Sequence, residues 1–175
     1  MTKYVALLRG VNVGGHRRVP MADLRRTLTD SGYTEVRTLL QSGNVVFEAA
    51  EQPTADLVAA IEARLAAEFG FGVDVMVRSG AELRAMVAAN PLEVREPAKF
   101  AVAFLSPAAD LGVLAGIDPD DYAPDELRVG ERELYMYFPD GLGKARLTPI
   151  LARKLRDTAT VRNWNTVTKL LAMVE

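Results

Sequence analysis

Two glycine-rich segments of this chain contain the residue types that could bind an anion. The first, residues 9–18 (RGVNVGGHRR), joins an expected strand to an expected helix. Glycine lets backbone N–H groups approach a ligand, and the N-terminus of the following helix favours negative charge. The segment matches neither a Walker A loop nor the dinucleotide fingerprint. The alternative is a loop in which glycine only allows unusual dihedral angles. The candidate ligand-binding residues are Arg9, Gly10, Asn12, Gly14 and Gly15.

The second glycine-rich segment, residues 137–146 (YFPDGLGKAR), also joins a strand to a helix. Two cations follow its glycines, and Lys144 is the candidate ligand-binding residue. Asp140-Gly141 is equally an ordinary turn signal, so a purely structural turn is the alternative.

Two shorter polar segments complete the candidate site. Residues 41–44 (QSGN) predict a turn whose side chains could contact a ligand. Residues 162–165 (RNWN) combine a guanidinium, two amides and the only tryptophan. The alternatives are that the asparagines cap helices and that the tryptophan belongs to the core. The candidate ligand-binding residues here are Ser42, Asn44, Arg162, Asn163, Trp164 and Asn165.

Several chemistries are excluded by composition. The chain has no cysteine, which rules out disulfides, thiol nucleophiles and the usual structural zinc sites. His16 is the only histidine, so no multi-histidine metal site can form, and no metal is expected. The motif segments also lack the paired carboxylates of acid–base catalysis. The sequence identifies no catalytic residue and no cofactor.

Charge is distributed unevenly along the chain, although the net charge is only −2. Residues 1–42 contain seven lysines and arginines against three acids, and residues 144–175 contain seven against two. The middle of the chain is therefore strongly acidic. We expect the two basic ends to form a common basic face on which residues 10–15 and 162–165 lie together.

No apolar run approaches the 18 or more residues that cross a bilayer, and the start of the chain lacks signal-peptide features. We therefore expect a cytoplasmic protein without a membrane partner.

The hydrophobic pattern of residues 1–78 predicts a ferredoxin-like βαββαβ lobe. Both helices should cover one face of an antiparallel sheet, and the first strand should be central. Strands are expected at residues 3–9, 36–40, 44–48 and 73–78, and helices at residues 20–31 and between Pro53 and Gly70.

Residues 79–98 are expected to form a connecting helix and linker, opened by a capping box from Ser79 to Glu82. Residues 99–175 predict a related βαββα lobe followed by a final helix, so that the fold class is α+β. This lobe lacks the last strand of the first, and no sequence self-similarity accompanies the common order. The two lobes could also count as one compact domain. The second lobe should contain strands at 99–105, 126–129 and 133–138. Its first helix is expected at 108–116. A second helix should have Thr148 as N-cap and Pro149 as its first residue, and a final helix should be capped by Asn163 or Asn165.

Five ordered blocks give the chain a resemblance to a known family. LLRGVNVGG, MADLR, QSGNVVF, YFPDGLGKARL and RNWNTVTKL resemble, in order and spacing, the uncharacterised family called domain of unknown function 1697. The resemblance runs from about Tyr4 to Leu171. It implies a ferredoxin-like first half and a related second half, and it implies no activity.

Three classes of function remain open. The first is a binding module for an anionic ligand, which would be a nucleotide, a phosphorylated metabolite or, with less support, RNA. The second is an enzyme of unassigned chemistry. The third is a scaffold that binds a protein partner. The sequence favours them in this order and does not give the oligomeric state.

Overall fold

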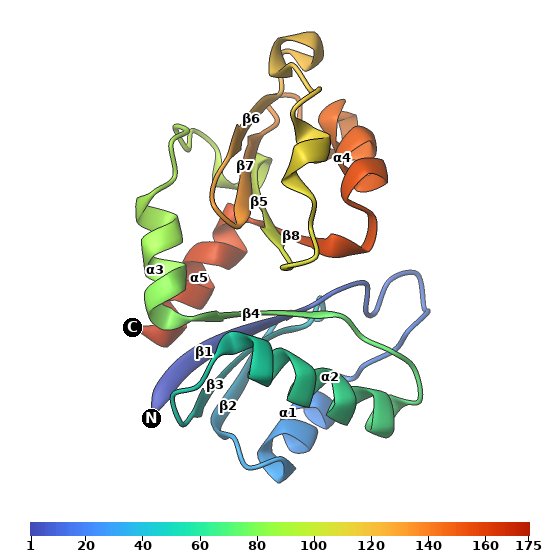
Figure 1. Cartoon of the computed structure of the whole chain (residues 1–175), viewed down its shortest axis with the longest axis vertical. Coiled ribbons are helices and arrows are strands. Elements are labelled where there is room, and N and C mark those ends of the chain that lie inside the picture. Colours follow the sequence, from blue (N-terminus) through green and yellow to red (C-terminus); the bar gives the residue numbers. More distant parts are fainter. The chain divides into compact units, whose positions relative to one another are not determined.

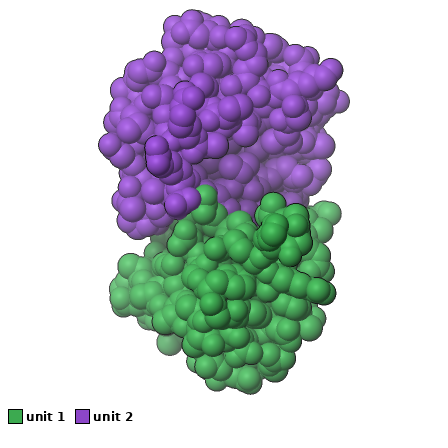
Figure 2. Space-filling view, turned by 90° about the vertical axis from the view of Figure 1, so that its right-hand side faces the viewer, with its two compact units in different colours: residues 1–85, 169–175 green, residues 86–168 purple.

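The chain folds into two compact units, which are coloured separately in Figure 2. The computed structural model describes all of residues 1–175. Unit 1 contains Met1–Ala85 and Lys169–Glu175, and unit 2 contains Met86–Thr168. The two divisions fall inside helices α3 (Gly80–Ala88) and α5 (Trp164–Val174). Each of these helices is therefore shared between the units.

Unit 1 contains a four-stranded antiparallel sheet with the strand order β2-β3-β1-β4 (Figure 1). The first strand lies centrally, between β3 and β4. This is the ferredoxin-like arrangement, so the prediction for residues 1–78 is confirmed. The elements are β1 (Thr2–Leu8), α1 (Met21–Asp30), β2 (Thr34–Leu39), β3 (Asn44–Ala49), α2 (Thr54–Phe69) and β4 (Val75–Ser79).

The core of unit 1 lies between one face of this sheet and helices α1 and α2. Alternate residues of β1 point to this face, because successive side chains of a strand alternate between faces. They are Tyr4, Ala6 and Leu8, all buried. The helices contribute buried residues spaced four apart, which are Leu24 and Leu28 from α1 and Leu57, Ile61 and Leu65 from α2.

Two predicted helix ends of unit 1 are confirmed. Gly70 ends α2 in the left-handed conformation, at φ 79°, and its N–H donates to the oxygen of Ala66. The Ser79–Glu82 capping box opens α3: the Ser79 N–H donates to Oε2 of Glu82 at 2.8 Å, and the Glu82 N–H donates to Oγ of Ser79 at 3.1 Å.

The last turn of α5 is tied to the unit 1 sheet by two cations. Arg37 on β2 donates from Nη2 to the oxygen of Met173 at 2.8 Å. Lys3 on β1 donates from Nζ to the main-chain oxygen of Glu175 at 3.1 Å. The last carbonyls of a helix have no partner within it, so these cations supply the missing donors.

Unit 2 repeats the same sheet topology, with the order β6-β7-β5-β8 and antiparallel pairing throughout. Helix α4 and the short helix η2 cover one face, where they bury a second apolar core. The elements are η1 (Pro97–Lys99), β5 (Phe100–Leu105), η2 (Leu111–Leu114), η3 (Pro119–Tyr122), β6 (Glu126–Val129), β7 (Glu133–Tyr137), η4 (Leu142–Lys144), α4 (Leu147–Leu155), η5 (Arg156–Thr158) and β8 (Ala159–Asn163).

Strand β8 was not predicted from the sequence, which indicated a lobe without a last strand. The reason is an inverted pattern. The two buried positions of the strand are polar, Thr160 and Arg162, whereas Val161 between them is 48% exposed. A strand is normally recognised by apolar residues on its buried face, so this segment carries no ordinary strand signal.

Two helix predictions in unit 2 need correction. The helix expected at residues 108–116 is only the single-turn η2. Helix α4 begins before Thr148, and its cap comes from a distant carboxylate. Oδ2 of Asp125 accepts from the N–H groups of Arg146, at 2.6 Å, and Leu147, at 3.1 Å. Sequence reasoning looks for a cap next to the helix, and Asp125 lies about 20 residues earlier.

Candidate functional site

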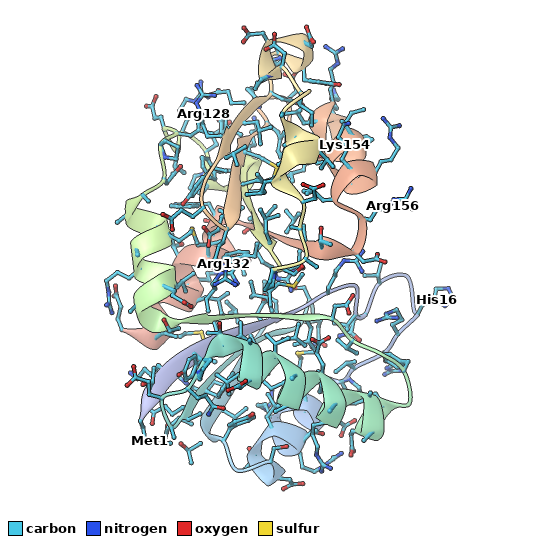
Figure 3. All side chains as sticks on the ribbon, viewed as in Figure 1. Met1, His16, Arg128, Arg132, Lys154 and Arg156 are labelled. Atoms are coloured by element: carbon cyan, nitrogen blue, oxygen red, sulfur yellow. The ribbon has the colours of Figure 1, made fainter.

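The first glycine-rich segment forms a small hairpin at one end of the unit 1 sheet. The Asn12 N–H donates to the oxygen of Arg17 at 3.1 Å, and the His16 N–H donates to the oxygen of Val13 at 3.0 Å. Gly14 and Gly15 form the turn, at φ 59° and 78°. A type I′ hairpin turn needs positive φ at both central residues, which explains the glycine pair. Figure 3 shows His16 at the outer end of this loop.

Asn12 holds the hairpin in place through its side chain. Nδ2 donates to the oxygen of Val19 at 2.9 Å and to the oxygen of Gln41 at 2.6 Å. Oδ1 accepts from the Val19 N–H at 2.8 Å. The residue is also in the left-handed conformation, at φ 56°, which asparagine tolerates better than most residues. Asn12 therefore connects the hairpin to the turn of residues 41–44.

Gly43 brings this turn against the strand that leads into the hairpin. A Cβ atom on Gly43 would lie 2.7 Å from Cβ of Leu8 and 2.9 Å from Cγ2 of Val11, and the residue has φ 86°. Its carbonyl oxygen accepts from the Leu8 N–H at 2.8 Å. Asn44 is fully buried and donates from Nδ2 to Oγ of Ser42 at 2.9 Å. The candidate residues of unit 1 are thus gathered at one end of its sheet.

Arg17 braces the loop from the other side and was missed in the sequence analysis. It donates from Nε to the oxygen of Gly10 at 3.2 Å and from Nη2 to the oxygen of Gly72. Its guanidinium lies 5.2 Å from the ring centroid of Phe71. The sequence gives no signal for this role, because Phe71 and Gly72 lie more than 50 residues away. Arg9 is partly neutralised by Asp74, at 3.9 Å.

The outer side of the hairpin has hydrogen-bond donors without acceptors in the protein. The peptide N–H groups of Gly14 and Gly15 form no hydrogen bond within the chain. The side chains of His16 and Arg18 are exposed and have no protein partner. The hairpin therefore presents backbone donors and a guanidinium to solvent on a loop that other residues hold in shape.

Arg162 is the most deeply buried candidate in unit 2. Only 8% of the residue is exposed, and Nη1 donates to Oγ1 of Thr160 at 2.7 Å and to the oxygen of Val161 at 3.0 Å. Burial lowers the pKa of its guanidinium to about 10. Burial of a cation costs free energy, and the hydrogen bonds to Thr160 and Val161 offset part of that cost.

Of the other candidates of unit 2, Asn163 and Trp164 contact other residues, whereas Asn165 and Lys144 are exposed. Oδ1 of Asn163 accepts from the Thr166 N–H at 2.9 Å, so Asn163 caps α5 as predicted. The Trp164 ring packs edge-on against Phe100, with centroids 4.9 Å apart. Asn165 is exposed, and Lys144 is exposed at the end of η4.

The candidate residues thus fall into one group in each unit. Residues 10–15 belong to unit 1 and residues 162–165 to unit 2. The expectation that these segments share a surface stays a prediction, as does ligand binding by each residue.

The structure contains neither a metal-binding cluster nor a membrane-spanning helix. No group of three or more histidine, cysteine, aspartate or glutamate residues is arranged to hold a metal ion. No helix is both long and apolar enough to cross a membrane.

Comparison with known proteins agrees with this topology and with the blocks LLRGVNVGG, MADLR and QSGNVVF, whereas the blocks YFPDGLGKARL and RNWNTVTKL lie beyond the matched residues. The model of a family described as "Protein of unknown function (DUF1697)" matches residues 1–135. The chain belongs to this family. A solved structure of a conserved bacterial protein, SP0830 from Streptococcus pneumoniae, is 25% identical, with a TM-score of 0.85 and 99% of each chain covered. A search of curated proteins found no match. The likeness to this solved structure supports the fold, and the DUF1697 description assigns no activity.

Proposed function

We propose that this protein is a binding module for a small anionic ligand, a nucleotide or a phosphorylated metabolite, held at the hairpin of residues 9–18. One observation carries the proposal: the exposed donors of Gly14, Gly15 and Arg18 stand on a hairpin that Asn12 and Arg17 hold in shape. A loop fixed before binding loses little conformational entropy when the ligand arrives. Backbone N–H groups and a guanidinium are the donors that phosphate oxygens accept most readily.

A small ligand is favoured over single-stranded RNA. RNA-binding sheets stack bases on exposed aromatic side chains of their central strands. In unit 1 the aromatic residues on these strands, Tyr4 and Phe47, are 2% and 0% exposed. The sheet therefore offers no stacking surface. We further propose the cytoplasm as the compartment.

Titration of the full-length protein with pyrophosphate and with ATP, followed by amide NMR, tests the proposal. We expect saturable shifts centred on the amides of Gly14, Gly15 and Arg18. Arg18→Gln should weaken binding by about tenfold, because a charge-assisted hydrogen bond is lost. Arg25→Gln is the matched control, since this exposed arginine of α1 donates to Thr38. Shifts that avoid the hairpin, or equal weakening by both variants, would overturn the proposal.

A further inference from the structure

Helix α4 and its flanking residues carry five basic side chains and no acidic one between residues 141 and 156. The apolar side of α4 is buried in the core of unit 2, and all five cations are exposed. Figure 3 shows Lys154 and Arg156 extending from the side of α4 that faces away from the strands. We call this set the α4 basic surface; it consists of Lys144, Arg146, Arg153, Lys154 and Arg156.

The cations of the α4 basic surface form no ion pair. Some exposed arginines elsewhere are held by carboxylates, as Arg26 is by Asp23 and Glu68, whereas isolated ones such as Arg64 and Arg84 are not. On the α4 basic surface only Arg146 has partners, which are the oxygen of Ala123 at 3.5 Å and the ring of Tyr122. These five side chains are therefore not held by ion pairs, although Asp140 and Asp157 lie directly before and after the segment.

Helix stability explains only part of this charge. Arg153 and Lys154 lie in the last turn of α4, where cations stabilise the helix dipole. Lys144 and Arg146 lie at the opposite end, before the first turn, where the dipole disfavours cations. The protein therefore retains cations where they oppose the helix dipole.

Arg156 is a further cation at a position where the fold disfavours it, here because of its backbone conformation. It has φ 45° and ψ −128°, a conformation that glycine adopts readily and that other residues adopt only at a cost. A glycine here would relieve the strain, so folding alone does not account for an arginine. This residue and the two cations before α4 point to a requirement for positive charge itself.

We propose that the α4 basic surface binds the phosphodiester backbone of double-helical nucleic acid without sequence preference. A helix of the length of α4 spans roughly 13 Å, close to the width of about 12 Å of the B-DNA major groove. Cations at the two ends of α4 can therefore contact phosphates of both strands. The surface has no exposed aromatic side chain on which single-stranded bases would stack, because its nearest ring, Tyr122, lies half-buried beside Arg146. This inference is independent of the proposed ligand site in unit 1.

The test uses the full-length protein and a labelled DNA duplex of about 20 base pairs of arbitrary sequence. Binding should be weak, because the rest of the chain is acidic, and it should decrease steeply with salt. Each phosphate contact contributes about −0.9 to the slope of log K against log salt, so five cations give a slope of about −4.5. The double variant Arg153→Gln/Lys154→Gln should change the slope to about −2.7.

The matched control is the double variant Arg64→Gln/Arg84→Gln. These exposed arginines lie on helices α2 and α3 and have no protein partner. Their substitution removes two positive charges, the same number as the α4 variant removes. If this control changes the slope as much as the α4 variant does, bulk charge explains the binding and the proposal is overturned. Absence of duplex binding, or tighter binding of a single strand of equal length, would also overturn it. Equal binding of a duplex RNA would overturn the fit of α4 to the major groove, because the major groove of A-form RNA is too narrow to admit a helix.

A second variant separates binding from folding. Arg156→Gly should raise stability against urea, because it relieves the backbone strain, and should reduce the slope by about 0.9 in magnitude. A loss of stability together with unchanged DNA binding would show that Arg156 serves the fold, and it would overturn its assignment to the binding surface.

Discussion

Arg78 and Arg162 occupy the same position in two separate sheets. Each is the fourth residue of the last strand of its sheet, β4 or β8. Each lies opposite a valine of the central strand, which is Val5 in unit 1 and Val102 in unit 2. Each is buried and donates from Nη1 to the carbonyl oxygen of the residue before it, at 3.1 Å and 3.0 Å. The two units therefore share a local design as well as a topology.

The next residue extends this correspondence. Ser79 follows Arg78 and caps α3, and Asn163 follows Arg162 and caps α5. The common sequence is only a Val-Arg pair before a capping residue. A match this short is not visible along the chain, and only the two sheets show that the positions are equivalent.

Gly43→Ala should be strongly destabilising. The added Cβ would meet Leu8 and Val11 closer than atoms can approach, in a backbone conformation that alanine rarely adopts. We expect a loss of about 3 to 4 kcal/mol in the free energy of unfolding, measured by urea melts. Gly70→Ala is the control, because Gly70 has φ 79° but open space around it, and it should lose only about 1 to 2 kcal/mol. Equal losses would mean that the close packing at Gly43 is not significant.

Asn12→Ala should loosen the hairpin. It removes two donated hydrogen bonds and one accepted bond, so we expect a loss of about 2 to 3 kcal/mol and faster hydrogen exchange at the Val19 amide. Asn165→Ala removes the same side chain at an exposed helical position and should change stability by less than about 0.5 kcal/mol. An unchanged exchange rate at Val19 would contradict the bracing role of Asn12.

Asp125→Ala should destabilise unit 2 through the start of α4. The variant removes the acceptor of the Arg146 and Leu147 N–H groups, at a cost of about 1 to 2 kcal/mol in urea melts. Thr148→Ala should cost less than about 0.5 kcal/mol, because Thr148 is not the cap. The reverse order of the two effects would favour the cap expected from the sequence.

Tyr135 should make stability depend on pH in the alkaline range. Burial, followed by the charge of Glu133, raises the pKa of Tyr135 from 10.0 to about 12, and its hydroxyl donates to the oxygen of Met86 at 2.8 Å. As the pH rises, the unfolded chain loses the Tyr135 proton before the folded protein does. The contribution of Tyr135 to the free energy of unfolding is therefore fully present below pH 10 and decreases from pH 10 to about 12. Urea melts across this range test the expectation, and Tyr135→Phe should remove this part of the decrease. A folded-state titration of Tyr135 near pH 10 would contradict it.

Most of unit 1 could be predicted because its local signals agree with its fold. Leu57, Ile61 and Leu65 lie on one helix face, Gly70 ends that helix, and the Ser79–Glu82 box opens the next. Each of these signals acts within a few residues along the chain. Their agreement with the tertiary structure is what makes a sequence of this kind readable.

The rest could not be predicted, because it depends on contacts between distant residues. Asp125 caps a helix about 20 residues further on, and Arg17 reaches the backbone at Gly72. Arg162 lies on a buried strand face where a cation is unexpected. The candidate residues therefore follow from residue type alone, which gives no indication of the groups that hold them in place.

The division of α5 between the two units has a consequence for the order of events during protein synthesis. The strands of unit 1 are synthesised before unit 2, yet unit 1 also includes Lys169–Glu175, in which the main-chain oxygens of Met173 and Glu175 accept from Arg37 and Lys3. The whole of unit 2 is made between these two parts. Arg37 and Lys3 therefore gain these two acceptors only after residues 86–168 have been made.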